Sequence, residues 1–375
     1  MAHPGTNPFP RRLAARLLAA CAALLLVQPA AAGAPRARHA PAQAADPDLD
    51  DPPCQPVASL TAPLRPVAAD GTRISYCWGP MTWNEPSDPG RPLLYQSFTF
   101  YPSTVAPPAG VGRPHPLVMY FHPDGSRSPI DQAATPDLYD QVVTQANARG
   151  WSVVSVEFRH PVVDEDYPND PPDDLRVPHW DVAYATQFFR HIDVALDIDA
   201  KNLFSVGFSR GTLSLWTALQ PNMATSTQPE STRVNAVFGY QAQTSYSGQE
   251  FASLFVVPRD QASVTEQFDA SWPMYAQFGS ALDSVAPDSP PVQVRYEDPF
   301  QPYPVPGVFF TGEPGVPPVY DSAHFPGYGQ ELCARYAAVA PATPCIVQPG
   351  VPFAAPPGQM TAFSGYIAFF TPYLK

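Results

Sequence analysis

The sequence has few cysteines, few cationic residues and no repeated unit, and each shortage argues against a class of protein. Five cysteines occur among 375 residues and none forms a Cys-x-x-Cys pair, so a zinc knuckle or a dithiol redox motif has no support. The 21 lysines and arginines are outnumbered by 34 aspartates and glutamates, which argues against nucleic acid or an anionic membrane surface as the partner. No period of roughly 20 to 50 residues recurs, so a solenoid is not expected.

An apolar run near the N-terminus is too short to serve as a membrane-spanning helix of the mature protein. Residues 17–27 are apolar, Arg11, Arg12 and Arg16 precede them, and small residues follow. This order is typical of a secretory signal peptide, which we expect over residues 1–34. Its removal takes the formal net charge from −13 to −16. We therefore expect a secreted or periplasmic protein without stable membrane insertion.

Two other export routes stay open, and a leader follows the signal. Cys21 ends a Leu-Ala-Ala-Cys stretch that resembles a lipobox, and Arg11 with Arg12 resembles a twin-arginine signal. Residues 35–53 are rich in Ala, Pro and Asp and have no periodicity, which predicts a disordered leader. Residues 54–375 are long enough for one large domain.

Four cysteines remain once Cys21 is removed with the signal, and four cysteines allow three pairings. We favour the two local pairs, Cys54–Cys77 and Cys333–Cys345, because each closes a short loop around turn residues. Closing a loop of that length stabilises a fold by roughly 3 kcal/mol if the bond is unstrained. Disulfides also agree with export.

Apolar runs alternate with segments of helical period, which is the pattern of a parallel sheet covered by helices on both faces. The expected strands are residues 97–101, 116–121, 151–158, 203–206, 234–240 and 292–296. The expected helices are residues 137–149, 181–196 and 212–219. Residues 241–290 are irregular, and we expect them to hold a cap or insertion over the edge or mouth of the sheet.

A Gly-x-Ser-x-Gly motif stands between the expected strand 203–206 and the expected helix 212–219. Gly207 and Gly211 flank Ser209, and their lack of a Cβ lets the chain turn sharply between sheet and helix. Such a turn lifts the hydroxyl above the strand ends, where α/β sheets place their ligands. The N-terminus of the helix that follows favours negative charge developing there. The motif therefore predicts Ser209 as a nucleophile.

Residues 117–219 resemble the α/β-hydrolase superfamily, most nearly its secreted carboxylesterase and lipase branch. The features occur in the family's order: a strand ending in a His-x-x-Gly turn at 122–125, a second strand, a long helix, and the run around Ser209. The resemblance implies one α/β-hydrolase domain, with a mostly parallel sheet of about eight strands and helices on both faces. It also implies an exported serine hydrolase that cleaves carboxylic esters through an acyl-enzyme, without metal or organic cofactor.

In that family two backbone N–H groups form the oxyanion hole. The resemblance places them here at Arg210, directly after the nucleophile, and at the turn of Asp124 and Gly125. Each such donor is worth about 3 kcal/mol in the transition state. The turn departs from the family's glycine-rich form, and Pro123 has no N–H to donate.

A serine hydroxyl needs a base, and His324 is the only histidine after Ser209. The family order of serine, acid and histidine makes Asp298, just past the expected strand 292–296, the favoured acid. Glu297, Asp283 and Asp321 are weaker candidates for the same role.

A second assignment of the C-terminal third competes with the first. Residues 306–318 resemble the seventh strand of the family with its acid turn, but Gly315 stands where the aspartate is expected. The later segments then read as a helix, an eighth strand and a closing helix. In this assignment the base position falls near residues 351–353, which contain no histidine, and His324 belongs to a structural turn.

Other polar residues have plainer interpretations. His122 is interpreted as a hydrogen-bonding residue of its turn, and His179 and His191 are expected to face solvent on the long helix. The acidic run at residues 164–174 could hold Ca²⁺, but it lacks EF-hand spacing and is read as a solvated loop. The aromatics of residues 271–278 are read as core rather than as an acyl pocket.

The sequence thus predicts a hydrolase of small esters or of acylated polymers, with the substrate and the oligomeric state left open. A rival from another class is a protein of the same fold that has lost its base and binds a ligand, polymer or partner. An acyltransferase on the same site is a third reading. The position of His324 relative to Ser209 separates the enzyme from the binding protein.

Overall fold

The computed structural model describes most of the chain from residue 97 onward and two short strands before it. The described residues are 55–56, 72–77, 97–110, 114–123, 130–158, 177–224, 229–245, 247–255, 260–271, 279–300, 324–356 and 358–375. The expected signal peptide and leader, Cys54, residues 164–174, most of residues 271–278, and residues 306–318 lie outside them.

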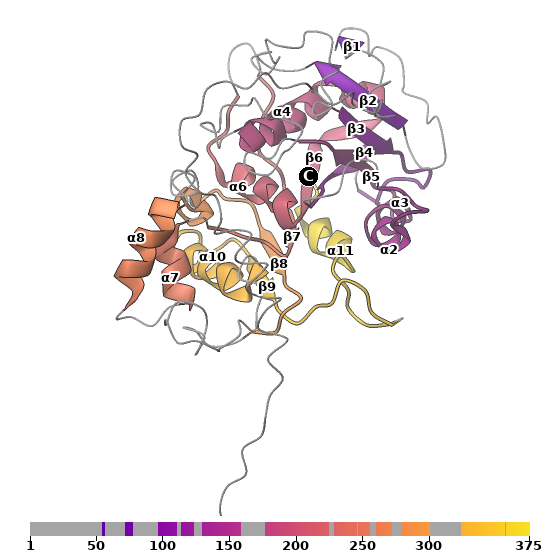
Figure 1. The fold of residues 1–375 in the computed structure, drawn as a ribbon. Helices are drawn as coiled ribbons and strands as arrows, with labels where there is room; N and C mark the ends of the chain where they lie inside the picture. Colours follow the sequence, from indigo (N-terminus) through magenta and orange to yellow (C-terminus); the bar gives the residue numbers. More distant parts are fainter. Residues whose placement is uncertain are drawn as a thin grey trace, which may run out of the picture.

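A single sheet runs through the molecule (Figure 1). Within the described residues its strands follow the order β1-β2-β3-β5-β4-β6-β7-β8-β9. They are β1 (Gln55–Pro56), β2 (Thr72–Cys77), β3 (Ser97–Tyr101), β4 (His115–Phe121), β5 (Ser152–Val156), β6 (Ile198–Phe208), β7 (Val237–Tyr240), β8 (Val292–Arg295) and β9 (Cys345–Gln348).

The sheet is mixed but mostly parallel, as expected, whereas its strand number is not. β3 is antiparallel to both of its neighbours, β2 and β5, while β5, β4, β6, β7, β8 and β9 run parallel. The expectation of about eight strands is wrong: the sheet of the described residues has nine, the outermost being the two-residue β1, which pairs only with β2.

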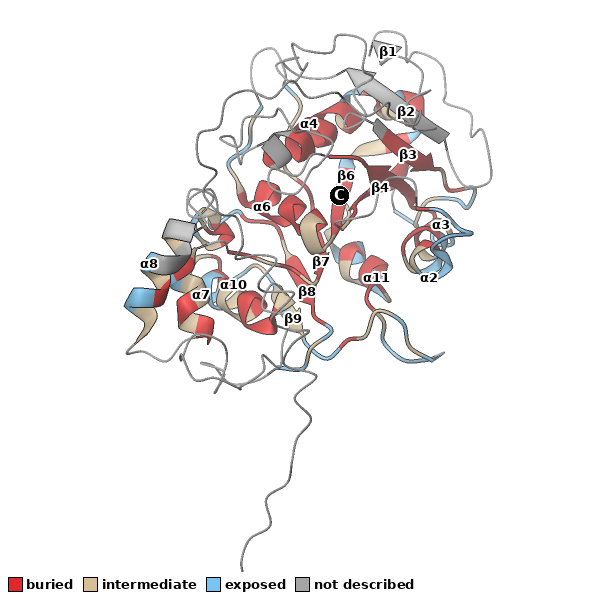
Figure 2. Ribbon diagram, viewed as in Figure 1, coloured by how far each residue is buried: buried red, intermediate tan, exposed pale blue. Residues whose placement is uncertain are grey.

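Alternate side chains of the central strands enter two separate cores, because successive residues of a strand point to opposite faces. In β4, Leu117, Met119 and Phe121 belong to one core, and Val118 and Tyr120 belong to the other. All five are fully buried, and both faces of the sheet are covered (Figure 2). Burial on both faces explains why this segment reads as a continuous apolar run.

Helices form the two outer layers. The first core packs beneath α4 (Val177–His191), α5 (Asp193–Leu196), α6 (Leu213–Leu219) and α10 (Pro326–Val339). The second packs beneath α2 (Pro136–Tyr139), the π-helical η3 (Asp140–Thr144), α3 (Gln145–Asn147) and α11 (Tyr366–Phe370), which η8 (Thr371–Tyr373) follows. The expected helix 137–149 is therefore divided into three segments.

The segment expected to be irregular contains helices. After β7 come α7 (Gly248–Phe255), α8 (Gln261–Ser271) and the short 3-10 turn η6 (Ala281–Ser284). Figure 1 shows α7 and α8 beside α10, toward one end of the sheet. Ala252, Leu254 and Phe255 of α7 form a third core with Phe325 and Tyr328. The insertion is therefore packed against the start of α10.

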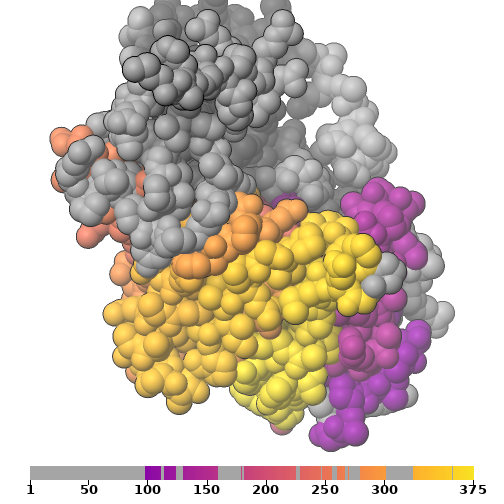
Figure 3. Space-filling model, turned by 90° about the horizontal axis from the view of Figure 1, so that it is seen from below, coloured from indigo at the N-terminus to yellow at the C-terminus, as the bar shows by residue number. Residues whose placement is uncertain are grey.

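One of the two expected disulfides lies within the described residues and is present. Cys333 of α10 is bonded to Cys345 at the start of β9. The bond ties a surface helix to the edge strand, 12 positions apart in sequence. Residues after 324 form much of the face seen in Figure 3, next to residues from the first third of the chain. The pair Cys54–Cys77 stays a prediction, since Cys54 is not described.

Candidate active site

Ser209 lies on a sharp turn between β6 and α6. β6 ends at Phe208, and the turn η4 (Ser209–Thr212) leads directly into the helix. Ser209 has a φ of 50°, in the left-handed region that residues other than glycine rarely occupy. Such strain persists only where the surrounding structure holds it, and it is common at functional sites. The motif therefore forms the elbow that the sequence predicts.

The two glycines are required by the close approach of neighbouring backbone. A Cβ on Gly207 would overlap the carbonyl oxygen of Gly211, and a Cβ on Gly211 would overlap that of Phe121 at the end of β4. The elbow is thus pressed against the carboxyl end of the adjacent strand. Any larger residue at these positions must displace main chain.

The structure brings Ser209 and His324 together. The Oγ atom of Ser209 lies 2.9 Å from Nε2 of His324, a distance at which the hydroxyl donates a hydrogen bond to a neutral imidazole. Both residues are partly exposed. A serine in hydrogen-bond reach of an imidazole has the geometry of an activated nucleophile.

His324 reaches the serine from an unexpected place in the topology. It stands two residues before α10, and therefore before β9 and α11. The second sequence assignment correctly placed a helix, a strand and a closing helix after this residue. It wrongly made His324 remote from Ser209. The first assignment correctly predicted the strand at 292–296 and the pairing of His324 with Ser209.

The position where the second assignment expects the base is occupied by an aromatic side chain. Phe353, which follows β9, stacks on Phe208 with ring centroids 5.6 Å apart. Tyr240 at the end of β7 also contacts Phe208, and its hydroxyl donates to the carbonyl of Val351 at 3.1 Å. Packed rings thus support the strand that carries Ser209 on this side.

Asp298 lies beyond the end of β8, at the same end of the sheet as Ser209. Its carbonyl oxygen accepts a hydrogen bond from Gly350 N–H at 2.8 Å. The pKa of Tyr240 is raised by burial first, then by the charges of Glu297 and Asp298 nearby. The carboxylate therefore lies near the ring that contacts Phe208. Its role as the triad acid stays a proposal.

The other candidates for the triad acid are Glu297, Asp283 and Asp321, and only the first two are described. Glu297 is exposed and affects Tyr240 more than Asp298 does. Asp283 is exposed on η6, and Asp321 lies outside the described residues.

One proposed oxyanion donor is described and one is not. Arg210 follows Ser209 in η4, whereas Asp124 and Gly125 lie outside the described residues. The side chain of Arg210 turns away from the hydroxyl: its guanidinium donates to the carbonyl of Phe158 at 3.1 Å and lies over that ring at 4.8 Å. Donation by the backbone N–H of Arg210 to an oxyanion stays a proposal.

A buried polar pair supports the other side of the same turn. His122 Nε2 lies 2.9 Å from Oε1 of Glu157, and both side chains are almost fully buried. The ring of His122 also contacts Phe158 at 5.1 Å between centroids. Phe158 therefore joins the ends of β4 and β5 to the elbow through Arg210. Neither Glu157 nor Phe158 was singled out in the sequence, because the two residues lie beside the elbow only as a result of the pairing of β5 with β4.

Three other histidines of the described residues, His122, His179 and His191, have partners of their own. His122 bonds within its own turn, donating from Nδ1 to the carbonyl oxygen of Pro123 at 3.0 Å, as expected. His191 is partly exposed and pairs with Glu230 at 2.9 Å. The expectation that His179 faces solvent is wrong. It is buried beside Trp216 and Thr217, and burial lowers its pKa to about 4.

Other candidate sites are limited. Among the described residues, no His, Cys, Asp or Glu cluster has the geometry to hold a metal ion. The helices in the described ranges are all too short or too polar to cross a membrane. A polar hollow of about 360 Å³ lies beside α7 and is lined by Glu250, Asp269 and Asp283, among others. Ser209 and His324 do not line it.

Comparison with known proteins relates this chain to solved structures alone. No family model and no curated protein matches it. A truncated carbohydrate esterase from gut microbiota superposes with a TM-score of 0.50 at 13% identity, over 82% of this chain and 98% of that one.

Two further solved structures resemble the chain more weakly. A thermophilic esterase from Thermogutta terrifontis has a TM-score of 0.47 at 14% identity, over 74% of this chain and 86% of that one. The acetyl ester-xyloside bifunctional hydrolase from Caldicellulosiruptor lactoaceticus has a TM-score of 0.45 at 13% identity, over 82% and 94%. Together with the sheet order, the likeness to the carbohydrate esterase shows that this chain shares an α/β fold with that protein.

Proposed function

We propose that the protein is an exported serine hydrolase that cleaves carboxylic esters through an acyl-enzyme on Ser209. The observation that carries the proposal is the 2.9 Å separation between Oγ of Ser209 and Nε2 of His324. A protein that had lost its base would not need to hold the imidazole at this distance from a serine in a strained backbone conformation.

The first half of the reaction follows from this geometry. His324 takes the hydroxyl proton as Oγ attacks the ester carbonyl, which forms a tetrahedral intermediate with an oxyanion. The backbone N–H of Arg210 and one from the turn at residues 124–125 stabilise that oxygen. The imidazolium of His324 then protonates the alcohol oxygen as the carbon–oxygen bond breaks. The acyl group stays on Ser209.

The second half repeats these roles with water. His324 removes a proton from water, which attacks the acyl carbon, and returns the proton to Oγ as the acid product leaves. Asp298 is the proposed acid that orients the imidazole and stabilises its charged form. No step requires a metal or an organic cofactor.

The proposed substrate is a small ester or an acyl group on a polymer. The net charge of the chain, −13, disfavours strongly anionic substrates. The proposal of export rests on the signal-like N-terminus and agrees with the disulfide between Cys333 and Cys345.

The test is hydrolysis of p-nitrophenyl acetate, p-nitrophenyl butyrate and acetylated xylan by the folded protein and by Ser209→Ala. Ser263→Ala, an exposed serine of α8, is the matched control. We expect turnover with wild type and Ser263→Ala, and a loss of at least about 1,000-fold with Ser209→Ala. Equal turnover by wild type and Ser209→Ala, or none by folded wild type, would overturn the proposal and favour a binding protein.

A further inference from the structure

His324 is followed by a residue that is anchored in the insertion. Phe325 is completely buried, and its ring lies 5.1 Å from that of Phe255, the last residue of α7. The two rings belong to a small core that also contains Leu254 of α7 and Val264 of α8. The backbone beside the imidazole thus packs against the last two residues of α7.

The packing between α7 and the start of α10 is tight. A Cβ on Gly327 would lie 2.5 Å from Cε1 of Phe325 and 2.9 Å from Cδ2 of Leu254. Both distances are shorter than side chains normally tolerate. Glycine at this position therefore lets the Phe325 ring and the Leu254 side chain pack against the first turn of the helix.

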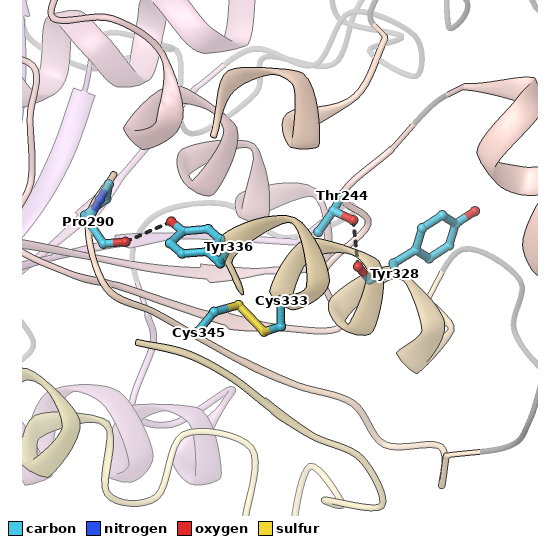
Figure 4. The surroundings of a disulfide bond; sticks show 6 residues. All are labelled: Thr244, Pro290, Tyr328, Cys333, Tyr336 and Cys345. Atoms are coloured by element: carbon cyan, nitrogen blue, oxygen red, sulfur yellow. Dashed lines mark hydrogen bonds between the residues drawn. A yellow bond between two sulfur atoms is a disulfide. The ribbon is translucent and has the colours of Figure 1, made fainter. Parts of the chain in front are cut away.

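The body of α10 is also fastened by contacts that do not involve α7. Figure 4 shows the disulfide from Cys333, the hydrogen bond from Tyr336 Oη to the Pro290 carbonyl at 2.8 Å, and the bond from Thr244 Oγ1 to the carbonyl of Tyr328 at 3.1 Å. These contacts fix the helix from Tyr328 onward against the sheet. Phe325, directly before the helix, packs on Phe255 of α7.

We propose that Leu254 and Phe255 are positioning residues, which hold His324 within reach of Ser209 by clamping Phe325. The inference rests on the proposed function, because it assigns these residues to the same site. It also gives the insertion a role in the site. The proposed base lies two residues before α10, and α7 holds the neighbouring Phe325 in place. Loss of the Phe255 ring would leave room into which Phe325 can move, carrying His324 away from Oγ.

The first test compares Phe255→Ala with the control Val264→Ala, which removes apolar volume from the same core on α8. We expect kcat of Phe255→Ala to fall about 100-fold with little change in KM, since a displaced base affects the chemical step more than binding. Val264→Ala should keep kcat within about threefold of wild type. A double variant with His324→Ala should be no slower than His324→Ala alone.

A second test does not require turnover. The histidine side-chain NMR resonances of wild type and variants report on the surroundings of each ring, and His324→Ala assigns its signal. Phe255→Ala should move or broaden the His324 signal while leaving that of His191 unchanged, and Val264→Ala should leave both unchanged. If Phe255→Ala does not fold, Phe255→Leu should show the same change to a smaller extent.

The outcomes separate the two proposals. An unchanged His324 signal in folded Phe255→Ala or Phe255→Leu overturns the positioning role, whatever the activity. An additional loss of rate from Phe255→Ala in the His324→Ala background also overturns it, because the effect would not pass through the imidazole. Absence of turnover in folded wild type, with the His324 signal still dependent on Phe255, overturns the proposed function alone.

Discussion

Oγ of Ser209 and Nε2 of His324 lie 2.9 Å apart, although 115 positions separate the two residues in sequence. β6 and α6 place the serine, whereas the start of α10 places the histidine. The pair is therefore assembled by two separate parts of the fold. Damage to either support should lower reactivity even when both side chains are intact.

Gly211→Ala should disrupt the elbow. The added Cβ would overlap the carbonyl oxygen of Phe121, so either the turn or the end of β4 must move. We expect the free energy of unfolding to fall by about 3 kcal/mol or more, and any ester hydrolysis to fall with it. Urea unfolding monitored by tryptophan fluorescence measures the first effect.

Gly239→Ala is the matched control for this variant. Gly239 of β7 is also a buried glycine, but its added Cβ would meet only side chains, at 3.3 Å or more. The free energy of unfolding should fall clearly less for Gly239→Ala than for Gly211→Ala. Equal losses would mean that the contact with Phe121 does not determine the requirement for glycine.

Replacing Cys333 and Cys345 by serine should destabilise the protein by about 3 kcal/mol, because the bond closes a loop of 12 positions. The midpoint of urea unfolding measures the loss, and wild type in a reducing buffer should lose a similar amount. A midpoint unchanged in both cases would show that the bond does not contribute to stability.

His179→Asn should remove part of the acid sensitivity of folding. Burial lowers the pKa of His179 from 6.5 to about 4, so the folded protein keeps this ring neutral while the unfolded chain protonates it. The contribution of this ring to stability is complete above about pH 6.5 and is lost progressively toward pH 4. The full difference is roughly 3 kcal/mol.

Urea unfolding at a series of pH values from 7 to 4 measures this effect. The free energy of unfolding of His179→Asn should fall less steeply with acid than that of wild type. His191→Asn, at a partly exposed position on the same helix, should follow the wild-type curve. Identical slopes for His179→Asn and wild type would contradict the assignment.

Glu157→Leu should destabilise the turn after β4, because it leaves the Nε2 atom of buried His122 without its acceptor. The expected loss is about 2 kcal/mol, and Glu157→Gln, which keeps an oxygen acceptor, should lose less. Thermal unfolding of the two variants and of wild type measures which variant loses more stability. A Gln variant less stable than the Leu variant would show that the hydrogen bond to His122 is not what Glu157 provides.

Much of the fold was readable in the sequence because buried parallel strands are short and continuously apolar. The segments around Val118, Val154 and Phe204 became β4, β5 and β6 for this reason. α7 and α8 were missed, since the insertion packs through a few residues such as Phe255 and shows no long apolar stripe. The π-helical segment between α2 and α3 was also missed, because periodicity does not reveal a local change in helical hydrogen bonding.

The sequence indicated which residues form the candidate site better than it indicated how the fold brings them together. Ser209 followed from the glycines beside it, and His324 followed from being the only downstream histidine. The sequence did not show that a histidine in the turn before a helix reaches Ser209, because the contact of Phe325 with α7 depends on tertiary packing between residues far apart in sequence. The burial of His179 was missed for the same reason: its neighbours Trp216 and Thr217 lie on another helix.

The most direct measurement is the rate at which a fluorophosphonate probe labels wild type, Ser209→Ala, His324→Ala and the control His191→Ala. One label should appear per wild-type molecule, on the peptide that contains Ser209, and none on Ser209→Ala. His324→Ala should react at least about 100-fold more slowly, and His191→Ala at the wild-type rate. Labelling of His324→Ala at the wild-type rate would contradict the assignment of His324 as the base.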